Sequence, residues 1–242
     1  MHRFTSILAV VMVTIGLSTG ASANDRQECA GPNHELRIAA CTRLLIANPA
    51  DFLAIANRGI SYRATADYDR ALADIEAALR MRPTYAGLYL ERALVLAETG
   101  QNAGAIRDFT EALRRDASLI VAYFGRAMAF EDTGQRERAK ADIESALDRN
   151  VLMVAALYMD RGYRLTKSRN YDKAIAAFDK SIEIYPNWLS AFFGRGAAHE
   201  AIGNHDLAVA DYRKTLNFQA IHGTDHEKQR SARERLAKSA RE

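Results

Sequence analysis

Arginine and aspartate recur in this chain at a separation that would let them pair. Four arginines are each followed sixteen residues later by an aspartate, giving Arg58 with Asp74, Arg92 with Asp108, Arg126 with Asp142 and Arg195 with Asp211. A planar guanidinium can donate two parallel hydrogen bonds to one carboxylate, so each pair could tie two segments together. We therefore favour structural pairs, with an anion-binding ladder as the alternative. A fifth arginine, Arg161, has Ala177 at the paired position, and Asp179 is its candidate partner.

The other residues that could do chemistry form no set. His222 and His226 are four apart, but Gly223 between them disfavours the helix that this spacing needs to hold a metal. His199 is expected to be a packed core residue. The sequence has no phosphate-binding glycine motif and no nucleophile elbow. We therefore predict no catalytic residue, no metal site and no cofactor, and keep an enzyme or a metal-binding protein only as the weaker alternative.

The bulk composition describes an ordinary folded protein. The chain has 242 residues, of which 48% are hydrophobic, and its 33 basic and 30 acidic residues leave a formal charge of +3. Such a small and evenly spread charge does not favour a nucleic-acid-binding surface. No nucleic-acid partner is expected.

The first residues have the features of a signal peptide, which we assign to 1–23. Arg3 precedes an apolar run from Ile7 to Leu17, and small residues stand at Ala21 and Ala23. The mature chain is then expected to have no membrane span and to be exported, to the periplasm or outside the cell. An uncleaved N-terminal anchor is the alternative.

The two cysteines, Cys29 and Cys41, would lie in a compartment where disulfides persist. A bond between them is expected. A reactive thiol is the lesser alternative, because no histidine pairing for nucleophilic catalysis can be defended.

The arginines also mark an internal repeat. Each is followed by a glycine or alanine, and successive pairs are 34, 34, 35 and 34 residues apart, at Arg58-Gly59, Arg92-Ala93, Arg126-Ala127, Arg161-Gly162 and Arg195-Gly196. An alanine follows each pair at a fixed distance, and a large apolar or aromatic residue stands four residues beyond it, as in Ala105 and Phe109. A period of this length is typical of a stack of helical hairpins.

The pattern resembles the tetratricopeptide repeat, a 34-residue helix-turn-helix, over about residues 52–222. The family's closing proline is kept at Pro83 and Pro186 but absent from the other repeats. The resemblance implies an all-α, right-handed superhelical solenoid of about five repeats. The expected parts are a degenerate N-terminal capping hairpin at 24–51, repeats at 52–85, 86–119, 120–153, 154–188 and 189–222, and a C-terminal capping helix at 223–242.

The resemblance also bears on the disulfide and the ion pairs. Cys29 and Cys41 correspond to positions that touch across a hairpin of this family, so the bond would staple the capping hairpin. The turn of each hairpin falls halfway between arginine and aspartate, and residues equidistant from an antiparallel turn lie at the same height.

In this family the first helix of each hairpin lines the concave face. Counting along the repeats gives a candidate groove formed by Asn57, Leu90, Glu91, Leu94, Glu98, Phe124, Met128, Glu131, Asp132, Met159, Asp160, Tyr163 and Phe193. Its apolar floor and acidic edges favour a protein segment with apolar side chains flanked by Lys or Arg. Of the clamp by which some relatives hold a C-terminal carboxylate, only Asn57 survives.

The resemblance thus implies an exported protein-protein interaction scaffold, of the kind used in envelope assembly, secretion or cell-wall machinery. An adaptor that uses the convex face or the C-terminal helix is the alternative.

Overall fold

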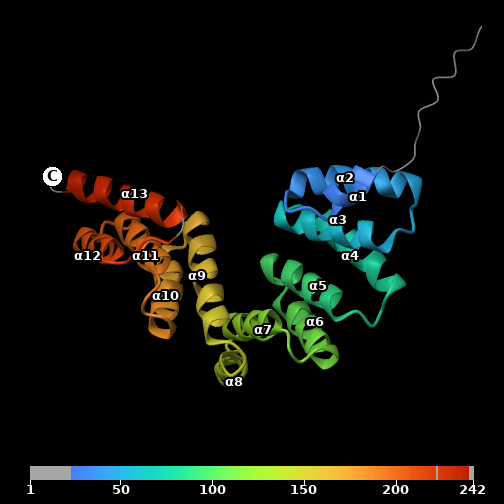
Figure 1. Cartoon of the computed structure of the whole chain (residues 1–242). Helices are drawn as coiled ribbons and strands as arrows, with labels where there is room; N and C mark the ends of the chain where they lie inside the picture. Colours follow the sequence, from blue (N-terminus) through green and yellow to red (C-terminus); the bar gives the residue numbers. More distant parts are fainter. Residues whose placement is uncertain (1–22, 222, 240–242) are drawn as a thin grey trace, which may run out of the picture. The chain divides into compact units, whose positions relative to one another are not determined.

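The computed structural model describes residues 23–221 and 223–239, so the predicted signal peptide lies outside the described residues except for Ala23, and His222 lies outside them too. Within this part the chain forms thirteen α-helices and no strand (Figure 1). It divides into two compact units, Met1–Arg82 and Pro83–Glu242, which are described in turn. The expected all-α solenoid of helical hairpins is confirmed. No helix in the described ranges is both long and apolar enough to cross a bilayer.

The first unit consists of two helical hairpins. They are formed by α1 (Ala23–Cys29), α2 (His34–Ala47), α3 (Phe52–Ala64) and α4 (Tyr68–Met81). A disulfide joins Cys29 to Cys41, whose Cα atoms are 4.9 Å apart, and so fastens the short α1 to α2 as expected. Both cysteines are buried against Leu44 and Ala54, so the bond is part of the core of the capping hairpin.

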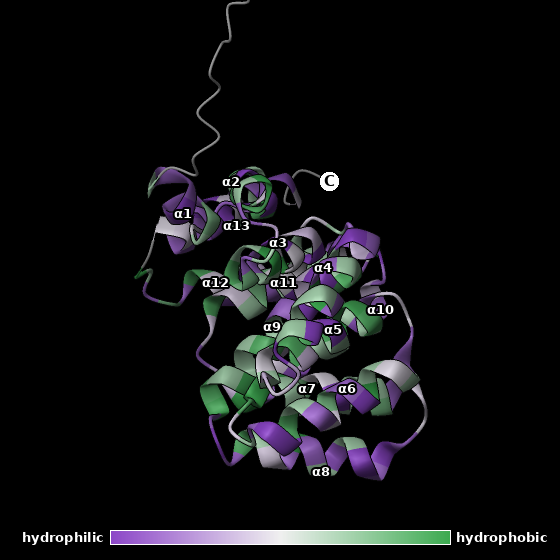
Figure 2. Ribbon diagram, turned by 90° about the vertical axis from the view of Figure 1, so that its right-hand side faces the viewer, coloured by the Kyte–Doolittle hydropathy of each residue, from purple (hydrophilic) through white to green (hydrophobic). Residues whose placement is uncertain are grey.

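The second unit stacks four further hairpins and a last helix. It contains α5 (Ala86–Glu98), α6 (Asn102–Arg115), α7 (Ile120–Asp132), α8 (Arg136–Leu147), α9 (Val151–Lys167), α10 (Tyr171–Ile184), α11 (Leu189–Ala201), α12 (His205–Leu216) and α13 (Gly223–Ser239). The first helices α5, α7, α9 and α11 each contact the next one along the stack. Helix α8, the second helix of the hairpin α7–α8, is largely hydrophilic (Figure 2). Its buried residues are Ala139, Asp142 and Ala146.

Side chains at the start of several helices set where those helices begin. The Asn33 side chain accepts a hydrogen bond from the Leu36 backbone N–H at 3.0 Å, and Asp51 caps α3 in the same way. Asn150 caps α9 by accepting from the Met153 N–H at 2.8 Å. Each cap satisfies a backbone donor that the helix itself cannot. As a result α9 begins within the range predicted for the third repeat.

The turn of each of the five repeat hairpins, α3–α4 to α11–α12, contains a residue in the left-handed region. Gly100, Gly134 and Gly203 fill this position with φ of 76°, 76° and 81°, which costs a glycine little. The other two turns place Ala66 and Arg169 there, at φ of 61° and 59°. These two turns therefore carry the strain of a side chain in a sparsely populated region.

Close helix packing holds neighbouring hairpins together. Phe109 and Phe178 are fully buried and fit against glycines of the following first helix. A Cβ atom at Gly125 would lie 2.4 Å from the Phe109 Cζ, and one at Gly194 would lie 2.5 Å from the Phe178 Cζ. Both distances are far below a normal contact, so a larger residue would push the hairpins apart.

The last helix covers the end of the stack. Ala232 is buried against Tyr212 and Ala208, and the Gln229 side chain donates a 2.7 Å hydrogen bond to the Phe218 carbonyl. The Tyr212 hydroxyl donates to Glu200 at 2.7 Å and accepts from Arg235 at 3.0 Å. Helix α13 is therefore fixed by polar contacts around a small apolar centre, as a cap requires.

Candidate functional site

The arginine and aspartate series forms guanidinium forks inside the hairpins. Arg126 donates from Nε to Asp142 Oδ2 at 2.8 Å and from Nη2 to Oδ1 at 2.7 Å. The same fork joins Arg58 to Asp74, Arg92 to Asp108 and Arg195 to Asp211. All four aspartates are buried. The structure therefore brings together each of the predicted pairs, and each fork joins the two helices of one hairpin.

Arg58, Arg126 and Arg195 each make a further bond that the sequence analysis missed. The remaining nitrogen, Nη1, donates to the residue sixteen positions earlier, as in Arg58 to Thr42 at 3.3 Å, Arg126 to Thr110 at 3.0 Å and Arg195 to Asp179 at 2.6 Å. The acceptor lies on the second helix of the preceding hairpin. Counting backwards as well as forwards from each arginine could have found it.

The proposed partner of Arg161 was wrong. Asp179 bonds to Arg195, and Arg161 instead lies near Glu131, with Nη1 3.6 Å from Oε2. This separation is too long for a hydrogen bond, and Nη1 is buried without one. The fourth hairpin of the repeat series therefore contains an incomplete pair.

The apolar residues predicted to line the groove lie on the first helices of the second unit. Six of them are half-buried and form what we term the first-helix row: Leu90, Leu94, Met128, Met159, Tyr163 and Phe193. Each also packs against buried core residues of its own hairpin or of the next one. The row therefore helps to pack the hairpins and still exposes part of its apolar surface.

Two aromatic residues are less available than predicted. Phe124 is only 4% exposed and its ring packs edge-on against Tyr158, with centroids 4.8 Å apart. It is a core residue, so the expectation that it presents a free ring is wrong. The Tyr163 hydroxyl donates to the Ser190 carbonyl at 2.6 Å and its ring packs on Phe178. Burial raises the pKa of Tyr163 above its usual value.

The acidic edge is partly neutralised by a residue that the sequence analysis did not select. Arg164 on α9 places Nε 3.0 Å from Asp160 Oδ2 and Nη1 3.5 Å from Glu98 Oε1 on α5. The Arg164 side chain thus connects α9 to α5, the first helix of the hairpin two positions earlier. Its spacing of four residues from Asp160 was the available signal.

The remaining predicted groove residues are placed as follows. Glu91 is half-buried on α5, and Glu131 and Asp132 are exposed at the end of α7. Asn57 is half-buried on α3, in the first unit.

No group of three or more potential metal ligands occurs among the described residues. His199 is buried at the position of a core aromatic, and its Nδ1 has no hydrogen-bond partner in the structure.

Comparison with known proteins places this geometry in context. The family model described as tetratricopeptide repeat matches residues 57–119 and 124–188. Over 60 residues the chain is 35% identical to the Hsp70-Hsp90 organizing protein of Triticum aestivum. That alignment covers 25% of this chain and 10% of the wheat protein, so it spans about a tenth of that relative's length.

Solved structures share the fold at low identity. PilW, described as a widely conserved type IV pilus biogenesis factor, is 16% identical with a TM-score of 0.57, covering 87% of this chain and 96% of its own. A tetratricopeptide repeat protein from Parabacteroides merdae is 19% identical with a TM-score of 0.51, covering 85% and 84%. At these identities the likeness shows the fold alone.

Proposed function

We propose that this chain, which belongs to the tetratricopeptide repeat family, binds a segment of another protein along the first helices of its second unit. Proteins of this family mediate protein-protein interactions. The observation that carries the proposal is the first-helix row, which leaves apolar surface partly exposed on the first helices of four successive hairpins, α5, α7, α9 and α11. Acidic side chains lie on the same helices. Apolar side chains left partly exposed on neighbouring helices favour an interaction site.

The row suits adaptable contacts with apolar side chains. Met128 and Met159 can adjust their rotamers to different partners, while Leu90 and Leu94 offer branched surface beside them. Burying each side chain further would contribute about 25 cal/mol per Å² of apolar area covered. Most of the affinity is therefore expected from a few apolar anchors.

The Arg164 contacts indicate the charge of the partner. This arginine already sits between Glu98 and Asp160, with its own side chain 56% exposed. It occupies the place that a lysine or arginine of a bound segment would take. A partner with basic residues beside its apolar anchors would compete with Arg164 for these two carboxylates.

We also propose export to the periplasm, and a role in envelope assembly, secretion or cell-wall machinery. The predicted signal peptide at 1–23 and the Cys29–Cys41 disulfide support export, because disulfides persist in oxidising compartments. Fractionation of the native cells, with N-terminal sequencing of the exported form, tests this. Unprocessed protein found only in the cytoplasm would contradict it.

We infer that binding, rather than catalysis, is the activity. The first-helix row and its acidic neighbours suit contacts with a protein segment, and the proposed site assigns no role to a catalytic acid or nucleophile.

The test of the binding site is photo-crosslinking in the native cells. A photoreactive residue at Leu94 or Met159 should capture one partner, and the same residue at the exposed Arg107 on α6 should not. Capture of the same protein with equal efficiency at Arg107 would refute a site on the first helices.

The captured segment then allows the charge of the site to be tested. Glu98→Lys should weaken binding of the segment, and Arg164→Ala should strengthen it by removing the competing cation. The exposed Arg213→Ala serves as the matched loss of charge. Weaker binding by Arg164→Ala would show instead that Arg164 contacts an acidic group of the partner.

A further inference from the structure

The fourth hairpin of the repeat series, α9–α10, lacks two side chains that the second and third hairpins have. In the second and third hairpins an arginine lies over the ring of the first helix's tyrosine, Arg115 over Tyr89 at 4.3 Å and Arg149 over Tyr123 at 4.4 Å. The same arginines donate to the tyrosine hydroxyls, at 3.3 and 3.2 Å. The corresponding residue of α10, at the same spacing of 26 from its tyrosine, is Ile184.

The second missing side chain is the aspartate of the fork. Ala177 stands sixteen residues after Arg161, where Asp142 follows Arg126. Two replacements in one hairpin thus remove the acceptor of an arginine and the donor to a tyrosine.

These replacements leave the Arg161 guanidinium without a good acceptor and the Tyr158 hydroxyl without an arginine partner, so both groups can donate to a ligand. Within the described residues the guanidinium of Arg161 has only Glu131, at 3.6 Å, and its Nη1 is buried without a hydrogen bond. The side chain of Arg161 is 19% exposed, whereas that of Glu131 is 47% exposed and can move aside. An arginine that is largely desolvated without a fork costs free energy, which a bound acceptor would recover.

The second donor is the hydroxyl of Tyr158, one turn before Arg161 on α9. Its hydroxyl has no hydrogen-bond partner among the described residues, and the residue is 7% exposed. Burial, followed by the charge of Glu131, raises the pKa of Tyr158 to about 12. The phenol therefore stays protonated at neutral pH and is available to donate.

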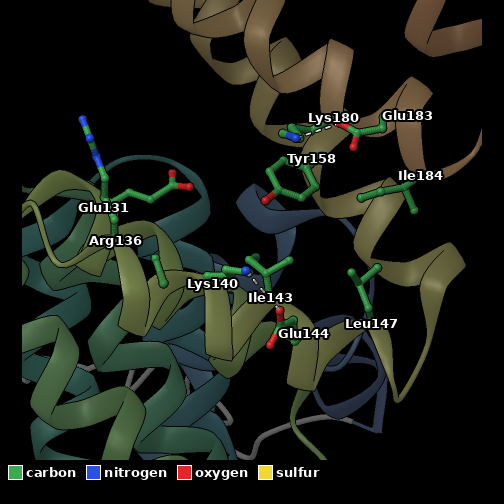
Figure 3. A pocket seen from close by; sticks show the side chains of 11 residues that line it. Glu131, Arg136, Lys140, Ile143, Glu144, Leu147, Tyr158, Lys180, Glu183 and Ile184 are labelled. Atoms are coloured by element: carbon green, nitrogen blue, oxygen red, sulfur yellow. Dashed lines mark hydrogen bonds and ion pairs between the residues drawn. The ribbon is translucent and has the colours of Figure 1, made fainter.

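Both donors line a cleft formed by α9, α10 and the end of α7. A cavity of about 510 Å³ is bounded by Arg161, Tyr158, Ala177, Lys173 and Lys180, with Glu131 and Asp132 at its edge. An adjoining cavity of about 350 Å³ continues along α8. Figure 3 shows it with Tyr158, Lys180 and Ile184 on one side and Ile143 and Leu147 on the other.

We propose that this cleft binds the carboxylate of an aspartate or glutamate side chain of another protein, with Arg161 and Tyr158 as its donors. The bound carboxylate would occupy the place that Asp142 has beside Arg126. Lys173 adds positive charge to the lining, whereas Lys180 is already paired with Glu183 at 2.7 Å. The apolar wall of Ile143, Leu147 and Ile184 accommodates the rest of the segment.

A carboxylate fits better than a phosphate group. The four complete forks of this chain show the same guanidinium geometry satisfied by a planar, singly charged acceptor. Glu131 and Glu183 lie close enough to affect Tyr158, so they would repel a dianion more strongly. The site is separate from the first-helix row and takes a ligand of the opposite charge.

The test is an NMR titration of the full chain with N-acetyl-aspartate methylamide at constant ionic strength. The Nε–H signal of Arg161 and the methyl signal of Ala177 should shift and saturate. The neutral N-acetyl-asparagine methylamide should shift neither. N-acetyl-alanine, which offers only a chain-terminal carboxylate, should bind more weakly. If it binds as tightly, the assignment to an acidic side chain is overturned.

A variant that places a carboxylate of its own beside Arg161 gives the decisive test. Ala177→Asp should restore the fork, raise the melting temperature and abolish the saturable shift of Arg161. The exposed Ala210→Asp adds the same charge to α12 and should leave binding intact. Binding that persists in Ala177→Asp would overturn the proposal.

Two further variants keep the proposal testable if Ala177→Asp folds poorly. Arg161→Gln should weaken binding about tenfold or more, as the loss of charge-assisted hydrogen bonds requires. Glu131→Gln should strengthen it, because the competing carboxylate is gone. Unchanged affinity in Arg161→Gln would overturn the proposal.

Discussion

Removing one member of a guanidinium fork should cost more than removing both. Arg126 and Asp142 have side chains that are 17% and 8% exposed and share two hydrogen bonds. Breaking a buried pair costs about 3–5 kcal/mol. Because Arg126 keeps its bond to Thr110 and some solvent, we expect Asp142→Ala to cost about 3 kcal/mol, at the lower end. Arg126→Leu, which adds apolar contact, should cost about 2 kcal/mol.

The double variant of Arg126 and Asp142 should then be no worse than Arg126→Leu alone, which gives a coupling of about 3 kcal/mol. Urea unfolding of the full chain, followed by circular dichroism, measures each free energy. Hydrogen exchange in α7 and α8 reports local opening, which stacked repeats allow. Arg161→Leu is the matched control without a fork and should cost less than about 1 kcal/mol. A coupling below about 0.5 kcal/mol between Arg126 and Asp142 would refute the structural role of the fork.

Three further outcomes follow from the structure. Replacing Cys29 and Cys41 together by serine should destabilise the first unit by about 3 kcal/mol, seen as faster hydrogen exchange in α1 and α2 but not in α5 to α13. Because burial raises the pKa of Tyr158 to about 12 from 10.0, its contribution to stability is complete below pH 10 and lost towards pH 12. Urea titrations should show this alkaline loss reduced in Tyr158→Phe and unchanged in Tyr185→Phe, whose ring is 40% exposed. Arg235→Ala should speed exchange in α13 alone, and protection equal to the parent would show that its polar contacts are dispensable.

The repeat spacing was sufficient to predict the hairpins and their internal pairs. Equal distance from a turn determines which residues face each other, so the partner of Arg126 could be named from the chain alone. The Cys29–Cys41 bond was also expected from the chain alone, because the two cysteines correspond to positions that touch across one hairpin. These contacts lie within one hairpin, where the position of the turn determines which residues face each other.

Contacts between hairpins were harder to predict because they depend on how each hairpin rotates on the last. The ion pair of Arg164 with Glu98 joins first helices two hairpins apart, and no count along the sequence gives that rotation. Phe124 was placed on the groove by its position in the repeat, yet it packs edge-on against Tyr158 of the next hairpin. The longer step of 35 residues falls at this junction, where α9 begins early at Val151.

Hairpin α9–α10 has the arginine of the fork without its aspartate, which is less stable than having both residues or neither. A hairpin with apolar residues at both fork positions would contain no buried charge to pair. Hairpin α9–α10 has an apolar residue only at the aspartate position, and so it keeps an arginine side chain that is 19% exposed. Glu131, at 3.6 Å and 47% exposed, offers no more than the 0–1 kcal/mol typical of a surface ion pair. Arg161 is therefore less stabilised than the arginine of a complete fork. A ligand that supplies a carboxylate could recover this difference in free energy. The same arginine position is therefore structural where the hairpin supplies the acid, and open to a partner where it does not.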